Sequence, residues 1–97
     1  MKEITLKRLV GDFAENKDLA KEIRIKNILP SLEKREIVVL NFAGVGGATQ
    51  SFIHALLSEA IRKHGADILD KIKFKNCNET IKKIITIVVE YMQESGF

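Results

Sequence analysis

Apolar and polar residues follow one another along this chain in blocks whose spacing switches between that of strands and that of helices. The apolar positions of residues 4–10 predict a first strand, which the pair Gly11-Asp12 ends. Asp18 is expected to cap a helix that runs towards Ile28. Pro30 is expected to interrupt that helix and to begin a further short turn, because proline has no N–H and its ring collides with the preceding turn.

A continuous apolar run covers residues 37–40 (Ile-Val-Val-Leu), and Phe42 follows it. Apolar side chains at successive positions point to both faces of a strand, so they predict a central strand with helices above and below. After three glycines, apolar residues recur at the spacing of a helix that ends near His64. The residues of this apolar helical face are Phe52, Ile53, Leu56, Leu57, Ala60 and Ile61.

The last third of the chain predicts one more strand and one more helix. Lysine alternates with apolar residues over Lys71–Lys75, which places Ile72 and Phe74 on one face and three lysines on the other. Exposed lysines deter pairing with another sheet, so an edge strand is expected. Cys77 or Asn78 precedes the last helix. Its predicted buried stripe consists of Ile81, Ile84, Ile85, Val88 and Met92.

The resulting order, βαβαβα, predicts an α/β fold with a mainly parallel sheet and helices packed on it, in two or three layers. A chain of 97 residues suffices for one such domain, spanning residues 1–97. Lys and Arg number 16 against 13 Asp and Glu without forming a basic arm, so nucleic acid is an unlikely partner. Because no apolar run resembles a signal peptide or a membrane span, a cytoplasmic protein without membrane contact is expected.

The candidate functional residues lie in residues 44–51 (Gly-Val-Gly-Gly-Ala-Thr-Gln-Ser), between the central strand and the next helix. Such turns present backbone N–H groups and hydroxyls, which anions, phosphates and partner proteins bind. No Gly-Lys-Ser/Thr follows, so the glycines of this loop, Gly44, Gly46 and Gly47, are expected to allow a tight turn with positive φ. The hydroxyl of Thr49 or Ser51 caps the helix or accepts a phosphate. A nucleotide- or anion-binding site at the glycines and helix N-terminus is the alternative.

The other polar residues do not predict a catalytic site, a metal site or a cofactor. His54 and His64 lie too far apart on their helix to bind one metal ion together, and neither has a carboxylate or nucleophile paired with it in the sequence. Cys77, the single cysteine, excludes an internal disulfide; its place before a helix can lower its pKa, but a structural role is expected. The exposed face of the helix, with His54, Ser58 and Arg62, is expected to contact a protein partner.

The central strand, loop and helix resemble the STAS domain of anti-sigma-factor antagonists and sulfate-transporter tails. More specifically, the chain resembles the bacterial family of STAS-like domains of unknown function. The resemblance rests on residues 37–45 (Ile-Val-Val-Leu-Asn-Phe-Ala-Gly-Val), on Ser51-Phe52 and on Leu56-Leu57. Residues 72–76 (Ile-Lys-Phe-Lys-Asn) resemble the family's next strand and polar turn, so the resemblance covers roughly residues 8–92.

The resemblance implies a non-enzymatic regulatory module of bacterial signalling that binds a protein partner, a GHKL-type ATPase or kinase, through loop 43–51 and the following helix. STAS antagonists carry an aspartate where this chain has Asn41, and an Asp-Ser-Ser/Thr-Gly turn where it has residues 49–52 (Thr-Gln-Ser-Phe). The usual phospho-acceptor position is therefore Gln50, which cannot be phosphorylated. A phosphorylation switch in this chain would use Ser51 or Thr49.

Overall fold

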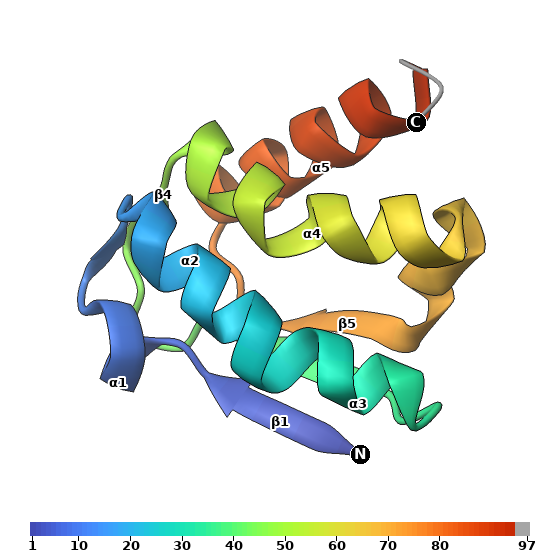
Figure 1. The fold of residues 1–97 in the computed structure, drawn as a ribbon. Helices are drawn as coiled ribbons and strands as arrows, with labels where there is room; N and C mark the ends of the chain where they lie inside the picture. The colour runs from blue at the N-terminus through green and yellow to red at the C-terminus, as the bar shows by residue number, and fades with distance from the viewer. Residues whose placement is uncertain (95–97) are drawn as a thin grey trace.

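Three parallel strands form the main sheet in the order β1-β3-β5, with β3 in the centre (Figure 1). The computed structural model describes residues 1–94, and its helices α2, α3 and α4 lie on one side of this sheet. The parallel α/β fold predicted from the sequence is therefore confirmed. In chain order the elements are β1 Lys2–Thr5, α1 Lys7–Val10, β2 Phe13–Ala14, α2 Lys17–Ile23, a π-helical segment Arg24–Ile28, α3 Leu29–Glu33, β3 Val38–Asn41, β4 Gly47–Ala48, α4 Gln50–His64, a 3₁₀ segment Ala66–Lys71, β5 Ile72–Lys75 and α5 Glu79–Glu94.

The central strand β3 has one face in the core and one face turned away from the helices. Leu40 is fully buried and lies in register between Ile4 of β1 and Phe74 of β5. The opposite face is polar. Its exposed residues on the two outer strands are Glu3, Thr5, Lys73 and Lys75. The expectation of helices above and below this strand is therefore wrong, and of the two arrangements considered the sheet adopts the two-layer one. Val39 stays 8% exposed on the outer face, flanked in register by Glu3 and Lys73.

Helix α4 is the central helix of the covering layer, and it packs against both α2 and α5. Its predicted apolar face is confirmed, since Phe52, Leu56 and Leu57 are fully buried. The helix ends as predicted at His64, followed by Gly65 with a φ of +82°. Because α4 lies between two other helices, its N-terminal half is bordered on both sides.

The first strand is shorter than the sequence predicts. It ends at Thr5, and after the buried residue Leu6 the chain turns into α1 instead of continuing as a strand to Val10. The last ladder bond runs from the N–H of Leu6 to the carbonyl of Asn41, at 3.0 Å. Because β3 ends at Asn41, a longer β1 would have no strand beside it.

The helix after β2 differs from its prediction at both ends. Its N-cap is Asn16, whose Oδ1 accepts the N–H groups of Asp18 and Leu19 at 2.9 and 3.2 Å, so Asp18 lies in the first turn. The helical path also continues through Pro30 instead of breaking there. It does so through the π-helical segment, where the N–H of Leu29 reaches back to the carbonyl of Arg24. A wider turn accommodates proline, which has no N–H to donate and needs space for its ring.

The C-terminal third agrees with its prediction. β5 is an edge strand with Ile72 buried. Asn78 precedes α5 and accepts the N–H of Ile81 on its Oδ1 at 2.8 Å, so of the two candidates Asn78 is the cap. The predicted stripe of α5 faces the core. Of its members Ile81, Ile85, Val88 and Met92 are buried and Ile84 is half-buried.

Candidate functional site

The loop between β3 and α4 is held by hydrogen bonds within the chain. The N–H of Val45 donates to the carbonyl of Phe42 at 2.9 Å, and that of Gly46 donates to the carbonyl of Asp12 at 2.7 Å. The N–H of Thr49 donates to the carbonyl of Ala14 at 3.0 Å. A phosphate cradle needs such N–H groups to point at the ligand. Because these three are already engaged, the loop does not favour the anion-binding alternative.

The glycines of this loop serve different purposes. Gly44 has a φ of +80°, so the predicted tight turn with positive φ is confirmed at this position. Gly46 and Gly47 do not have positive φ, and that expectation is wrong for them. Gly47 pairs with Phe13 in the short ladder of β2 and β4, and a Cβ at Gly47 would lie 2.8 Å from Cε1 of the Phe13 ring. Close packing, rather than a turn, therefore requires a glycine there.

The two hydroxyls at the start of α4 have different surroundings. Thr49 is half-buried and is the N-cap of the helix, since its Oγ1 accepts the N–H of Phe52 at 3.1 Å. Ser51 is exposed in the first turn, next to the exposed Gln50. The capping role that the sequence assigns to one of the two hydroxyls belongs to Thr49. Ser51 is left as the accessible hydroxyl of the pair.

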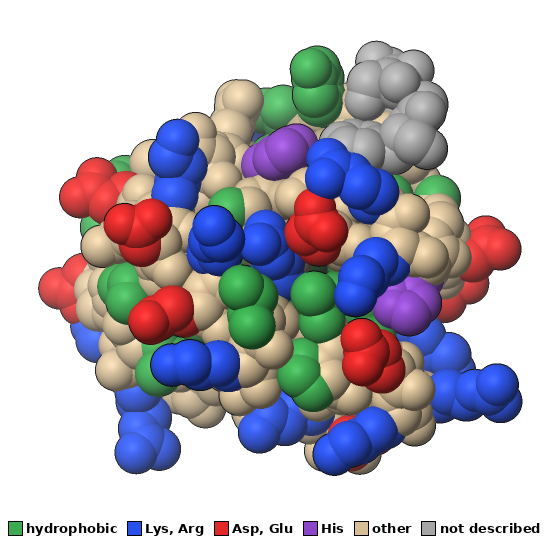
Figure 2. Space-filling model, viewed as in Figure 1, with side chains coloured by type: hydrophobic (Ala, Val, Ile, Leu, Met, Phe, Trp, Pro, Cys, Tyr) green, Lys and Arg blue, Asp and Glu red, His purple; other side chains and the backbone are tan. Residues whose placement is uncertain are grey.

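Ser51 lies in an open groove of about 420 Å³ between the first half of α4 and the second half of α5. Two apolar residues of α5 border it while exposed to solvent, Ile87 at 47% and Tyr91 at 62%. Figure 2 shows hydrophobic side chains exposed at the top of the molecule over α5, with a histidine and Lys or Arg side chains on the face below them. The residues that line this α4–α5 groove are Lys17, Gln50, Ser51, His54, Ala55, Ile87, Val88 and Tyr91.

The groove contains residues that the sequence did not single out. Lys17 comes from the first turn of α2, and Ile87 and Tyr91 come from α5. A sequence signal for the last two exists, because they are apolar, four residues apart and outside the buried stripe of their helix. The structure confirms that this pair lies on the solvent side of its amphipathic helix, beside the groove.

The face of α4 that is predicted to contact a partner is only partly exposed. His54 is half-buried and lines the groove. Ser58 is 6% exposed, so the expectation that it lies on the exposed face of the helix is wrong. Arg62 is one turn further on and pairs with Glu59 at 2.6 Å. The elements packed against α4 cover the middle of the expected face and leave its first half open to the groove.

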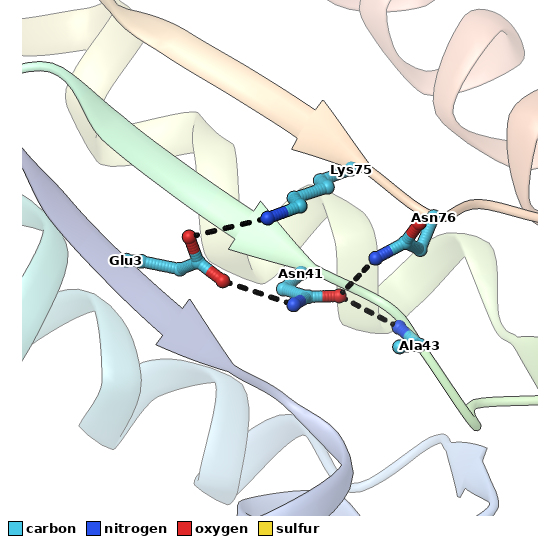
Figure 3. A network of polar contacts seen from close by, with 5 residues as sticks. All are labelled: Glu3, Asn41, Ala43, Lys75 and Asn76. Atoms are coloured by element: carbon cyan, nitrogen blue, oxygen red, sulfur yellow. Dashed lines mark hydrogen bonds and ion pairs between the residues drawn. The ribbon is translucent and has the colours of Figure 1, made fainter.

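A polar cluster surrounds Asn41 at the end of β3, on the outer face of the sheet (Figure 3). The Nδ2 of Asn41 donates to Glu3 at 3.0 Å, and its Oδ1 accepts the N–H of Ala43 at 2.9 Å and the Nδ2 of Asn76 at 3.0 Å. Lys75 adds an ion pair with Glu3 at 3.6 Å. An aspartate, which STAS antagonists have here, would have no donor for Glu3. The amide of Asn41 thus joins the end of β3 to β1, to the residue after β5 and to the start of the loop.

Cys77 precedes the cap of α5 and is half-buried. Burial raises the pKa of the Cys77 thiol above its ordinary value, and the positive charge of Lys82 opposes this effect without cancelling it. The lowered pKa considered from its position before a helix is therefore wrong. The structural role expected for this cysteine agrees with a raised pKa, which disfavours the reactive thiolate.

Within residues 1–94, no group of three or more His, Cys, Asp or Glu side chains is placed to hold a metal ion. In the same part of the chain, no helix is both long enough and apolar enough to cross a bilayer.

Comparison with known proteins identifies one family. The sequence profile of a family described as a STAS-like domain of unknown function matches residues 20–82. The match begins in α2 and ends in the first turn of α5, so it includes the loop and all of α4 but stops before Ile87 and Tyr91. No curated protein and no solved structure matches the chain.

Proposed function

The chain belongs to this family of STAS-like domains, and from that premise we propose that it is a non-enzymatic regulatory module that binds a protein partner through the α4–α5 groove. The observation that carries the proposal is the groove itself, where exposed Ile87 and Tyr91 border the exposed hydroxyl of Ser51. Exposed apolar side chains beside a concavity are typical of sites that bind other proteins. This surface is more specific than the loop and helix face expected from the sequence.

Ser51 is the residue through which the proposed binding is regulated. A phosphate on its hydroxyl would add about −1.5 to −2 charges inside the groove and at the N-terminus of α4, which favours negative charge. The same modification on Thr49 would remove the acceptor that caps the helix at Phe52. Ser51 therefore suits a reversible switch better than Thr49. The partner class that the family resemblance implies is a GHKL-type ATPase or kinase of the bacterial cytoplasm.

Photo-crosslinking in the cell tests the binding surface. A photoreactive amino acid replaces Tyr91 in one variant and Lys73, on the outer face of the sheet, in a matched control. We expect position 91 to crosslink to an ATPase or kinase that position 73 does not reach, and Tyr91→Ser to weaken binding of that purified protein at least tenfold, about 1.4 kcal/mol. Equal crosslinking at both positions, or unchanged binding by Tyr91→Ser, would contradict the proposal.

Charge substitutions on the same purified pair test the switch. Ser51→Asp is expected to weaken partner binding about tenfold, whereas Ser51→Ala binds like the native chain, because only the first adds charge to the groove. Thr49→Asp is the matched control, since Asp also caps helices and Thr49 does not line the groove. If neither aspartate changes affinity, the phosphorylation switch is wrong and the binding surface stands.

A further inference from the structure

Among the described residues that line the α4–α5 groove, the formally charged one, Lys17, is positive. Lys17 supplies a cationic ammonium group at one side, and His54 adds an imidazole. In the described part of the chain, no Asp or Glu is among the residues that line the groove. Asp18 and Glu90 are close to lining residues in the sequence, but they are not part of the lining. A ligand that carries carboxylates therefore meets a cation and no carboxylate within the lining itself.

Helix α4 adds to this attraction. Its first turn contains no acidic residue, and two residues of that turn, Gln50 and Ser51, line the groove. A helix N-terminus carries a partial positive charge, which an acidic side chain in the first turn would normally offset. No acidic side chain in the first turn of α4 offsets this partial positive charge, so a negatively charged ligand in the groove would offset it.

The groove also has an apolar part. Its apolar lining residues are Ile87, Val88 and Tyr91 of α5 and Ala55 of α4. A volume of about 420 Å³ holds a few side chains rather than a whole domain, and the groove is open to solvent. Such a shape suits a segment that contributes one or two apolar anchors and keeps its polar face towards Lys17.

We propose that the α4–α5 groove binds an acidic amphipathic segment of the partner protein, with apolar anchors against Ile87 and Tyr91 and carboxylates facing Lys17 and the first turn of α4. This inference rests on the proposed function, because it names the chemistry of the segment that occupies the same surface. It also explains how a phosphate on Ser51 acts, since negative charge in the groove repels an acidic segment.

Three synthetic peptides test the charge preference. They share the same leucine anchors at helical spacing and lack tyrosine and tryptophan, and their polar faces carry glutamate, lysine or glutamine. Tyr91 is the only tyrosine of a chain without tryptophan, so its fluorescence reports binding at the groove. We expect the glutamate peptide to bind about tenfold more tightly than the lysine peptide in calorimetry, with the glutamine peptide between them and the difference shrinking as salt is added.

Two charge reversals locate the effect. Lys17→Glu is expected to remove or invert the preference, and glutamate is well tolerated in the first turn of α2. Lys73→Glu changes the net charge equally on the outer sheet face, and we expect it to leave the preference unchanged. Equal affinity for all three peptides, equal effects of the two variants, or displacement of the glutamate peptide by an equal concentration of inorganic phosphate would overturn the inference.

The outcomes for the two proposals are distinguishable. If the peptides bind with equal affinity and Tyr91→Ser weakens all of them, the groove is a docking surface and its acidic preference is wrong. If no peptide binds or changes the fluorescence of Tyr91, the inference is overturned, while crosslinking at position 91 decides the proposed function independently.

Discussion

Asn78 joins the loop before α4 to the first turn of α5, and its replacement measures how firmly this end of the site is held. Its Oδ1 accepts the N–H of Ile81 at 2.8 Å, and its Nδ2 donates to the carbonyl of Gly46 at 2.9 Å. Loss of an N-cap costs about 1 kcal/mol, and loss of a further hydrogen bond costs about 1 kcal/mol. We therefore expect Asn78→Ala to lower the free energy of unfolding by about 2 kcal/mol.

Asn78→Asp separates the two bonds, because aspartate caps the helix but has no amide to donate to Gly46. Its expected loss is at most about 1 kcal/mol, since its charge also favours a helix N-terminus. Urea unfolding followed by far-UV circular dichroism measures both variants, and with a slope of about 1 kcal/mol per molar urea the alanine midpoint falls by about 2 M.

Amide hydrogen exchange supplies the local readout for the same pair. In both variants the N–H groups of Val45 and Gly46 are expected to exchange faster than in the native chain, because the loop has lost its bond to Asn78. Only the alanine variant is expected to loosen the first turn of α5. An equal loss of stability in the two variants, or unchanged exchange at Gly46 in the aspartate variant, would refute this assignment of the two bonds.

Further substitutions and ligands give four more expected results. Asn41→Asp places two carboxylates in contact and is expected to lower the free energy of unfolding, measured in urea, by about 1 kcal/mol. Adding Glu3→Gln should restore part of that loss, and no recovery would contradict the contact between Asn41 and Glu3. Gly44→Ala is expected to lower the free energy of unfolding by about 1 kcal/mol because Gly44 has a positive φ, and Gly46→Ala is expected to lower it by less than about 0.5 kcal/mol. Equal melting temperatures for the two variants would contradict this difference. Because the pKa of the Cys77 thiol is raised, iodoacetamide should modify the folded chain more slowly than the urea-unfolded chain. For the same reason, the free energy of unfolding should fall as pH rises through that pKa. Rapid modification of the folded chain would argue against the raised pKa. Millimolar GTP, ATP or phosphate should leave the melting temperature unchanged, and a rise would restore the anion-binding alternative.

Local patterns predicted those elements whose geometry depends on nearby residues. The run at residues 37–40 indicated a strand, and the apolar spacing from Phe52 onwards indicated α4 with its end at His64. Such patterns work because the 3.6-residue and two-residue periods are properties of the backbone. They did not predict the end of β1, because β1 can extend only as far as β3 lies beside it. They failed again at Pro30, where a π-helical segment lets the helix continue.

The short ladder of β2 and β4 shows the same dependence on distant partners. Each strand contributes two residues to this ladder, and neither residues 13–14 nor residues 47–48 have the sequence pattern of a strand. Gly47 is required there because the ring of Phe13 lies against it, a contact across more than thirty residues of sequence. The sequence suggested a turn for that glycine, and only the packed structure shows a close approach.

Part of the candidate site can likewise be predicted from the sequence, and the rest depends on packing. The sequence alone identified the start of α4, with Thr49, Ser51 and His54, because a strand-to-helix turn and its cap are local features. It did not bring Lys17 or Tyr91 to that place, and it left Ser58 on an exposed face. Those three positions were decided by the packing of α2 and α5 against α4, since burial depends on which helices meet. The groove therefore exists only in the folded chain, although the hydroxyl at its edge can be found in the sequence.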